Sequence, residues 1–280
     1  MSEAAALRSG PRHLLQALSA IVLRELFKFS RQSGRLVSAL VRPLLWLAVF
    51  AAGFRNVFGV AIVEPYDTYI SYDVYIAPGL VGMVLLFNGM QSSLAMVYDR
   101  EMGMMRLLLT APLPRAWILF CKLVATAVLS LLQALAFVIV AALLGTQLPF
   151  AGWHLVHVIV ATTSAALMLG ALGLVLSVNI KQLENFAGTM NFVIFPMYFM
   201  STALYPLWKL EESGATWVYQ LARFNPFTHA VEWMRFALYD KDPGASPYIV
   251  LGCLAVFFAV ACWGYDPQRG FGGLTKRGGG

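Results

Sequence analysis

Long apolar runs separated by short polar connections dominate the hydrophobic pattern of this chain. Crossing the roughly 30 Å hydrocarbon layer of a bilayer as a helix takes about 20 residues. Six runs are long enough, near residues 36–58, 75–97, 117–144, 155–179, 185–206 and 247–265. An even number of spans places both chain ends on the same side of the membrane. The pattern therefore predicts an all-α integral membrane protein.

The segment before the first run has the periodicity of an amphipathic helix. Its apolar side chains recur on one helix face, at Leu14, Leu18, Ile21, Val22, Leu26 and Phe29. Arg24, Lys28 and Arg31 fall on another face, which we expect to point toward anionic lipid while the helix lies in the headgroup region. This helix serves either as an anchor for the first span alone or also as a surface for a cytoplasmic partner.

Composition and charge support this picture and set the topology. Hydrophobic residues make up 59% of the 280 residues and charged residues 12%, and the mean hydropathy is +0.70, which water-soluble domains do not show. Most of the 20 lysines and arginines flank the first run, lie between the second and third, or lie in the tail. The positive-inside rule places these segments in the cytoplasm. The net charge of +6 thus reflects topology, and no nucleic-acid partner is expected.

Three parts follow from this topology: a cytoplasmic amphipathic segment over 1–34, a transmembrane domain over 35–265 and a cytoplasmic tail over 266–280. The connection between the second and third runs reads YDREMGMMRLLLTAPLPRAWILFCK from Tyr98. Acidic residues favour the start of a short helix there, and Pro112 ends it. Its apolar side chains need a cover, which a docked cytosolic protein would supply. An ordinary interfacial loop is the alternative, and the segment by itself favours the loop.

The connection between the fifth and sixth runs is long and aromatic. Its rings are Trp208, Trp217, Tyr219, Phe224, Phe227, Trp233 and Phe236. Because Trp and Tyr prefer the membrane interface and a proline breaks the pattern at Asn225-Pro226, the segment predicts two short amphipathic helices that form an outer cap over the bundle.

Several kinds of chemistry are missing from the sequence. The predicted spans contain no Asp or Glu, whereas ion-coupled transporters usually need an intramembrane carboxylate. The phosphate-binding pattern GxxxxGK[ST] is also absent, so the chain has no ATP site of its own. His154 with His157, and His229 with Glu232, have the spacing of one helix face, but two ligands do not make a metal site. We therefore expect no catalytic residue, metal or cofactor on this chain, and a motor on another polypeptide if transport is driven.

Polar residues inside the runs allow two interpretations. Taken singly, each is best explained by helix packing, as are the small residues Ala166, Gly170 and Gly173. Taken together, some of them would line a path for a substrate with an apolar body and a polar head. The residues of that path are Phe87, Asn88, Gln91, Asn191, Phe195 and Tyr198.

In order and in motif the whole chain resembles the permease subunits of the ABC type-2 exporter family, which includes drug, polysaccharide and lipo-oligosaccharide efflux permeases. The matching motifs are Arg100-Glu101-x-Gly103, Leu108-Leu109-x-x-Pro112-Leu113-x-Arg115 and Asn225-Pro226-x-Thr228. The resemblance implies that an inner segment is a coupling helix seated in a groove of an ATPase, with Asp99, Arg100, Glu101, Gly103, Arg106, Leu108 and Pro112 as its contact residues. It also implies a re-entrant outer cap that includes Asn225, Pro226 and Thr228. Relatives commonly carry Thr and an acidic residue after the glycine, where this chain has Met104 and Arg106.

The same resemblance implies an assembly and a location. Two permease copies, as a homodimer or a heterodimer, would bind two ATP-binding subunits that hold ATP and Mg²⁺, and would export a small amphipathic or hydrophobic substrate across a bacterial inner membrane. The segments SALVRPLLWLAVFAAGFR, EPYDTYISYDVYIAPGL and MVYDREMG resemble a narrower subgroup, the permeases linked to PQQ-dependent alcohol oxidation. The competing hypothesis is a membrane anchor or assembly subunit that recruits a cytosolic or redox partner and transports nothing.

Overall fold

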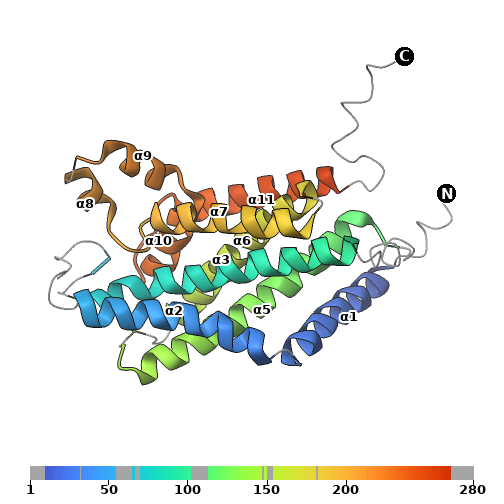
Figure 1. Cartoon of the computed structure of the whole chain (residues 1–280), viewed down its shortest axis with the longest axis horizontal. Helices are drawn as coiled ribbons and strands as arrows, with labels where there is room; N and C mark the ends of the chain where they lie inside the picture. Colours follow the sequence, from blue (N-terminus) through green and yellow to red (C-terminus); the bar gives the residue numbers. More distant parts are fainter. Residues whose placement is uncertain are drawn as a thin grey trace, which may run out of the picture.

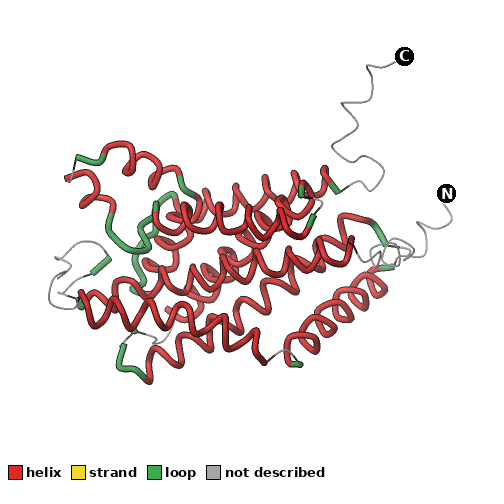
Figure 2. Tube along the Cα trace, viewed as in Figure 1, coloured by secondary structure: helices red, strands yellow, loops and turns green. Residues whose placement is uncertain are grey.

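A computed structural model describes residues 10–31, 33–54, 65–66, 70–101, 113–146, 148–149, 154–180, 182–212 and 214–265. Helices make up nearly all of this part of the chain (Figure 2). They are α1 (Pro11–Ser30), α2 (Ser33–Phe54), α3 (Tyr72–Glu101), α5 (Arg115–Leu143), α6 (His154–Asn179), α7 (Leu183–Phe199), α8 (Leu207–Glu212), α9 (Thr216–Phe224), α10 (Pro226–Leu238) and α11 (Ser246–Gly264). The long helices lie side by side as a bundle (Figure 1).

Four of the described helices are long and apolar enough to cross a bilayer: α3 over Tyr72–Tyr98, α5, α6 and α11. The first and fifth predicted spans correspond to α2 and α7. Helix α7 has only 17 residues, and within α2 the fully described apolar stretch is Leu40–Val49. The chain is thus a multi-pass helical membrane protein. The count of six spans stays a prediction.

The fifth predicted run ends earlier as a helix than its apolar pattern indicates. Met200 leaves the helical conformation, with φ −96° and ψ 53°, and residues 201–204 form buried turns instead. Two tyrosines of α3 bind these turns: Tyr72 Oη donates to the Leu204 carbonyl at 2.6 Å and Tyr75 Oη to the Thr202 carbonyl at 3.1 Å. An apolar run cannot distinguish a continued helix from turns buried in this way.

Helix α3 is the centre of the bundle, in contact with α2, α5, α6, α7 and α10. Glycines allow it to approach its neighbours closely. A Cβ atom added at Gly173 of α6 would lie 2.8 Å from the Gly89 carbonyl oxygen of α3, and one at Gly170 would lie 2.9 Å from Leu123 Cδ1 of α5. Ala166 is fully buried. The predicted packing role of Ala166, Gly170 and Gly173 is therefore confirmed.

Helix α1 lies obliquely beside the bundle, near the end where α3 finishes and α5 begins (Figure 1). It packs on α5, and Trp117 Nε1 donates a hydrogen bond to the Leu14 carbonyl at 3.2 Å. The predicted cationic face is only partly correct. Arg24 and Arg31 are exposed, but Lys28 is half-buried and faces the bundle.

The long connection between the fifth and sixth predicted runs folds into three helices, α8, α9 and α10, where the sequence predicts two. The break at Asn225-Pro226 lies where the sequence predicts it. Helix α9 exposes Trp217, Leu221 and Phe224, which the spacing i, i+4, i+7 places on one face, as expected of an interfacial helix. Helix α10 is different, because it packs between α3, α6 and α11.

Candidate functional site

The inner segment predicted to contact an ATPase is described only at its two ends. Asp99, Arg100 and Glu101 form the last turn of α3, so they continue a long helix and do not begin a separate one. Gly103, Arg106, Leu108 and Pro112 lie outside the described residues. The chain resumes before α5, whose N-cap residue is Pro114. The predicted contact segment thus connects α3 to α5 along the chain.

Asn88, predicted as a path residue, lies in a closed hydrogen-bond network between α3 and α5. Its amide donates to Ser130 Oγ at 2.7 Å and to the Thr126 carbonyl at 3.3 Å, and Gln133 Nε2 donates to Asn88 Oδ1 at 3.3 Å. Asn88, Ser130 and Gln133 are all buried. A satisfied network of this kind fixes two helices against each other, so the packing interpretation fits Asn88 better than a path.

The other predicted path residues do not gather around one space. Phe87 is buried, with the Arg42 guanidinium 3.9 Å from its ring centroid. Tyr198 is also buried, and its ring lies 6.0 Å from that of Phe227. Gln91 is half-buried. Asn191 and Phe195 lie on the exposed face of α7. The six residues thus divide between the interior of this chain and its surface.

In the outer cap, Asn225 joins the start of α10 to the end of α7. Its side-chain oxygen accepts from the Phe227 backbone N–H at 2.9 Å, which is an N-cap bond, and its amide donates to the carbonyls of Met197 and Met200 at 2.7 and 2.8 Å. Pro226 occupies the first helical position, where a missing N–H costs nothing. Thr228 is buried in the first turn of α10, and its hydroxyl has no hydrogen-bond partner among the described residues. Asn225 and Pro226 therefore have a structural role in holding α10 in place.

Arg235 of α10 is a buried cation that sequence reasoning missed. It is 2% exposed, and its guanidinium donates to Glu232 Oε1 at 2.5 Å, the Thr202 carbonyl at 2.8 Å and the Tyr75 carbonyl at 3.4 Å. Burial lowers the pKa of Arg235, but Glu232 and the Tyr75 phenol raise it more, so that its pKa lies above the usual value and the group stays charged. The available signal was an arginine three residues after a glutamate, a spacing that places both side chains on one helix face.

Asp73 is an acidic residue inside a spanning helix, where the sequence predicts none. Because α3 begins at Tyr72, before the predicted start of the span, this carboxyl group enters the first turn of a spanning helix and is 5% exposed. The prediction that the spans contain no Asp or Glu is wrong here. A carboxylate in the first turn is favoured by the helix dipole. Its Oδ1 has no hydrogen-bond partner among the residues described.

The two histidine pairs contact other side chains and a backbone carbonyl of the chain. His157 Nδ1 lies 2.8 Å and His154 Nδ1 3.8 Å from the carboxylate of Asp240, which joins α6 to the turn after α10. His229 contacts Ser246 Oγ and the Arg223 carbonyl, not its predicted partner Glu232. Across the described ranges, no group of three or more His, Cys, Asp or Glu side chains is arranged to hold a metal ion.

Comparison with known proteins places these elements in a family context. The family model described as ABC-2 type transporter matches residues 16–239. A relative from Porphyra purpurea, named as a candidate transport permease ycf38, is 28% identical over 82% of this chain and 76% of its own length. A relative of the same name from Cyanophora paradoxa is 30% identical over 79% of this chain and 74% of its own. The family match extends from α1 to the end of α10, and so includes α3 and the outer cap.

Proposed function

Because the chain belongs to the ABC-2 type transporter family and is a membrane-spanning transport subunit, we propose that it is the permease of an ATP-driven exporter. The sequence has no phosphate-binding loop, so ATP and Mg²⁺ would bind to a separate subunit. In this proposal two permease copies associate with two ATP-binding subunits. The segment after Glu101 would dock on the ATP-binding subunit.

The continuity of α3 is the observation that supports this function most directly. The helix begins at Tyr72, beside the buried turns of the outer side, and runs without a break to Glu101 at the docking segment. Along its length it packs on five other helices, with glycine at the closest approach to α6. Since well-packed elements move as units, a displacement of the inner segment would reach the outer cap through α3.

The substrate path would lie between two copies of the chain and not inside one. Within one chain, Asn88 and its partners are satisfied by one another and are not available to a substrate. Asn191 and Phe195 are exposed on α7 instead, next to Phe192, which is 79% exposed. Apolar and polar groups on one face suit a small amphipathic or hydrophobic substrate. A second copy facing α7 would enclose this surface.

Three finer points stay predictions: the location in a bacterial inner membrane with both termini cytoplasmic, the link to PQQ-dependent alcohol oxidation, and the homodimer. A membrane anchor that recruits a partner without transport is the competing hypothesis. The match to a transporter family and to relatives named as transport permeases favours transport over anchoring.

The test is reconstitution with an ATP-binding subunit. The chain is co-expressed with candidate ATP-binding subunits of ABC transporters, any complex is placed in lipid vesicles, and ATP hydrolysis is measured. We expect a stable complex whose assembly or hydrolysis is lost in Glu101→Arg and in Leu108→Asp. Glu212→Arg, which makes the same charge change on the exposed outer helix α8, is the matched control and should behave as the wild type.

Two results would count against the proposal in different ways. Failure to form a complex with any ATP-binding subunit would contradict the exporter and leave the anchor hypothesis. A complex whose activity is the same in all three variants would contradict only the docking role of the inner segment.

A further inference from the structure

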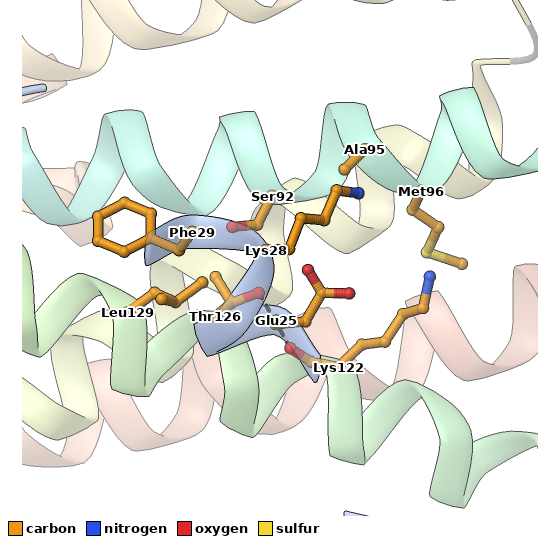
Figure 3. A pocket seen from close by; sticks show the side chains of 9 residues that line it. All are labelled: Glu25, Lys28, Phe29, Ser92, Ala95, Met96, Lys122, Thr126 and Leu129. Atoms are coloured by element: carbon orange, nitrogen blue, oxygen red, sulfur yellow. Dashed lines mark hydrogen bonds between the residues drawn. The ribbon is translucent and has the colours of Figure 1, made fainter. Parts of the chain in front are cut away.

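A small cavity lies where α1 meets α3 and α5, close to the ends of α3 and α5 that the predicted topology places in the cytoplasm (Figure 3). Its volume is about 30 Å³. Its wall is mixed: Lys28, Lys122, Ser92 and Thr126 contribute polar groups, and Phe29 and Leu129 contribute apolar ones. A cavity of this size has room for about two water molecules. It accepts a group as small as a phosphate and excludes a sugar or a nucleotide.

Lys28 is the unusual member of this wall. An amphipathic helix normally keeps its lysines on the solvated face, yet Lys28 is half-buried against the bundle. Within the described part of the chain its ammonium group makes no hydrogen bond or ion pair, and the Ser92 hydroxyl has no hydrogen bond either. Placing a charge in a partly buried site without a partner costs free energy. The position of Lys28 is explained if an anion binds beside it.

The charge around the cavity favours such an anion. Lys28 and Lys122 reach toward it from two helices, and Figure 3 shows both side chains extending along the direction in which α3 runs toward its end. The carboxylate of Glu25 lies between them in the same view, and it also pairs with Arg24 at 3.6 Å. Of the two ammonium groups and one carboxylate in this wall, only the ammonium group of Lys28 has no partner among the described residues.

The depth of the cavity in the membrane identifies the class of ligand. Tyr98, which is 46% exposed, marks the interface, because exposed tyrosines prefer that level. Ser92 lies about 9 Å further into the membrane along α3, at 1.5 Å per residue, and the two lysines extend back toward the interface as snorkelling side chains do. A ligand here needs an anionic group at the lysines and an apolar part beside Phe29 and Leu129. A phospholipid has both.

We propose that this cavity binds the phosphate group of an anionic phospholipid, in the leaflet next to the carboxyl end of α3. Lys28 and Ser92 would contact the phosphate, Lys122 would add charge, and the acyl chains would lie against the apolar wall. The bound lipid would then connect α1 to α3 and α5, beside the direct hydrogen bond from Trp117 to Leu14. This site depends on the chain spanning a membrane but not on transport.

The experiment measures lipid that stays bound to the purified full-length chain. The protein is reconstituted in discs of phosphatidylcholine with phosphatidylglycerol, extracted in mild detergent and weighed intact by native mass spectrometry. We expect one retained phosphatidylglycerol per chain, its loss in Lys28→Gln and its weakening in Ser92→Ala. Arg31→Gln removes the same charge from the exposed residue that follows α1 and should keep the lipid. Lys28→Arg, which keeps the charge, should also keep it.

A second measurement covers variants that change the fold of α1. Phosphatidylglycerol should raise the melting temperature of the wild type and of Arg31→Gln above that in pure phosphatidylcholine, but not that of Lys28→Gln. Equal lipid retention by Lys28→Gln and Arg31→Gln would overturn the proposal, because it would show only diffuse attraction to a basic helix. Inorganic phosphate that stabilises the protein in phosphatidylcholine to the same extent would also overturn it, since the ligand would then be free phosphate.

Discussion

Arg235 holds the outer cap to the rest of the bundle, and its replacement tests that role. In Arg235→Met the apolar stem is kept and the guanidinium is lost. The carboxylate of Glu232 loses its ion pair, and the carbonyls of Thr202 and Tyr75 lose a charged donor. Breaking a buried ion pair by removing one partner costs about 3–5 kcal/mol. The side chain of Glu232 is 21% exposed, so water compensates part of the loss, and we expect about 3 kcal/mol.

Thermal unfolding of the purified chain measures this loss. The 7 tryptophans of the sequence give an intrinsic fluorescence signal for the melting temperature in detergent or in lipid discs. One kcal/mol shifts the melting temperature by roughly 2–4 °C in chains of 150–250 residues, so Arg235→Met should melt about 6–12 °C lower. Arg223→Met, at an exposed position on α9, is the matched control and should change the melting temperature by about 2 °C or less.

The geometry of the guanidinium gives a second test of the same reasoning. Arg235→Lys keeps the charge but cannot reach three acceptors in different directions, because an ammonium group lacks the planar fork of arginine. It should recover less than half of the loss. If Arg235→Met and Arg223→Met had equal melting temperatures, the buried contacts would not stabilise the cap and the argument would be refuted.

Three further substitutions test other contacts by the same melting assay. Gly79→Ala would place a Cβ 2.7 Å from the Ala203 Cα and oxygen atoms and should lower the free energy of unfolding by about 1–3 kcal/mol. Gly252→Ala, with nothing within 4 Å of the added Cβ, should raise it by up to about 1 kcal/mol. Shifts of the two melting temperatures in the same direction would contradict this. Asn225→Ala should cost about 1–2 kcal/mol and speed amide exchange at the end of α7, while unchanged exchange would show that its two amide bonds do not matter. Asn88→Ala should lower the free energy of unfolding by about 1–3 kcal/mol, seen as a lower melting temperature, and should leave transport per folded molecule unchanged. Loss of transport without loss of stability would instead show that Asn88 lines a path.

The sequence was sufficient to predict where the helices lie, because a bilayer sets the length of an apolar helix. The second, third, fourth and sixth predicted runs each coincide, apart from a few terminal residues, with a helix that is long enough to span. The fifth run was predicted too long, since its last residues form turns held by tyrosines of α3. Such turns are as apolar as a helix, and only the tertiary partners of their carbonyls distinguish the two.

Predictions for the site depended on whether a residue acts locally or through a distant partner. The break at Asn225 follows from its own position before a proline, so the motif sufficed to place it. The partners of its amide, the carbonyls of Met197 and Met200, are more than 20 residues away and leave no local pattern. Lys28 illustrates the same limit, because which side of α1 faces the bundle depends on how α1 packs on α5, not on the periodicity of α1.

Polar contacts attach α3 to α10 near its outer end and to α5 in its middle. These contacts restrict how α3 can move. On the outer side the Tyr75 carbonyl accepts from Arg235 of α10, and in the middle Asn88 binds Ser130 of α5. Apolar contacts tolerate sliding, but hydrogen bonds in an apolar core fix orientation. We therefore infer that α3 tilts or shifts as one piece and does not rotate about its axis. Arg235→Met removes the polar contact of α3 with α10 on the outer side, while the hydroxyl bonds of Tyr72 and Tyr75 remain. A permease with this change should still stimulate ATP hydrolysis at the inner segment while transporting less per ATP. Equal loss of both activities would show that the outer contact is needed for assembly and not for transmission.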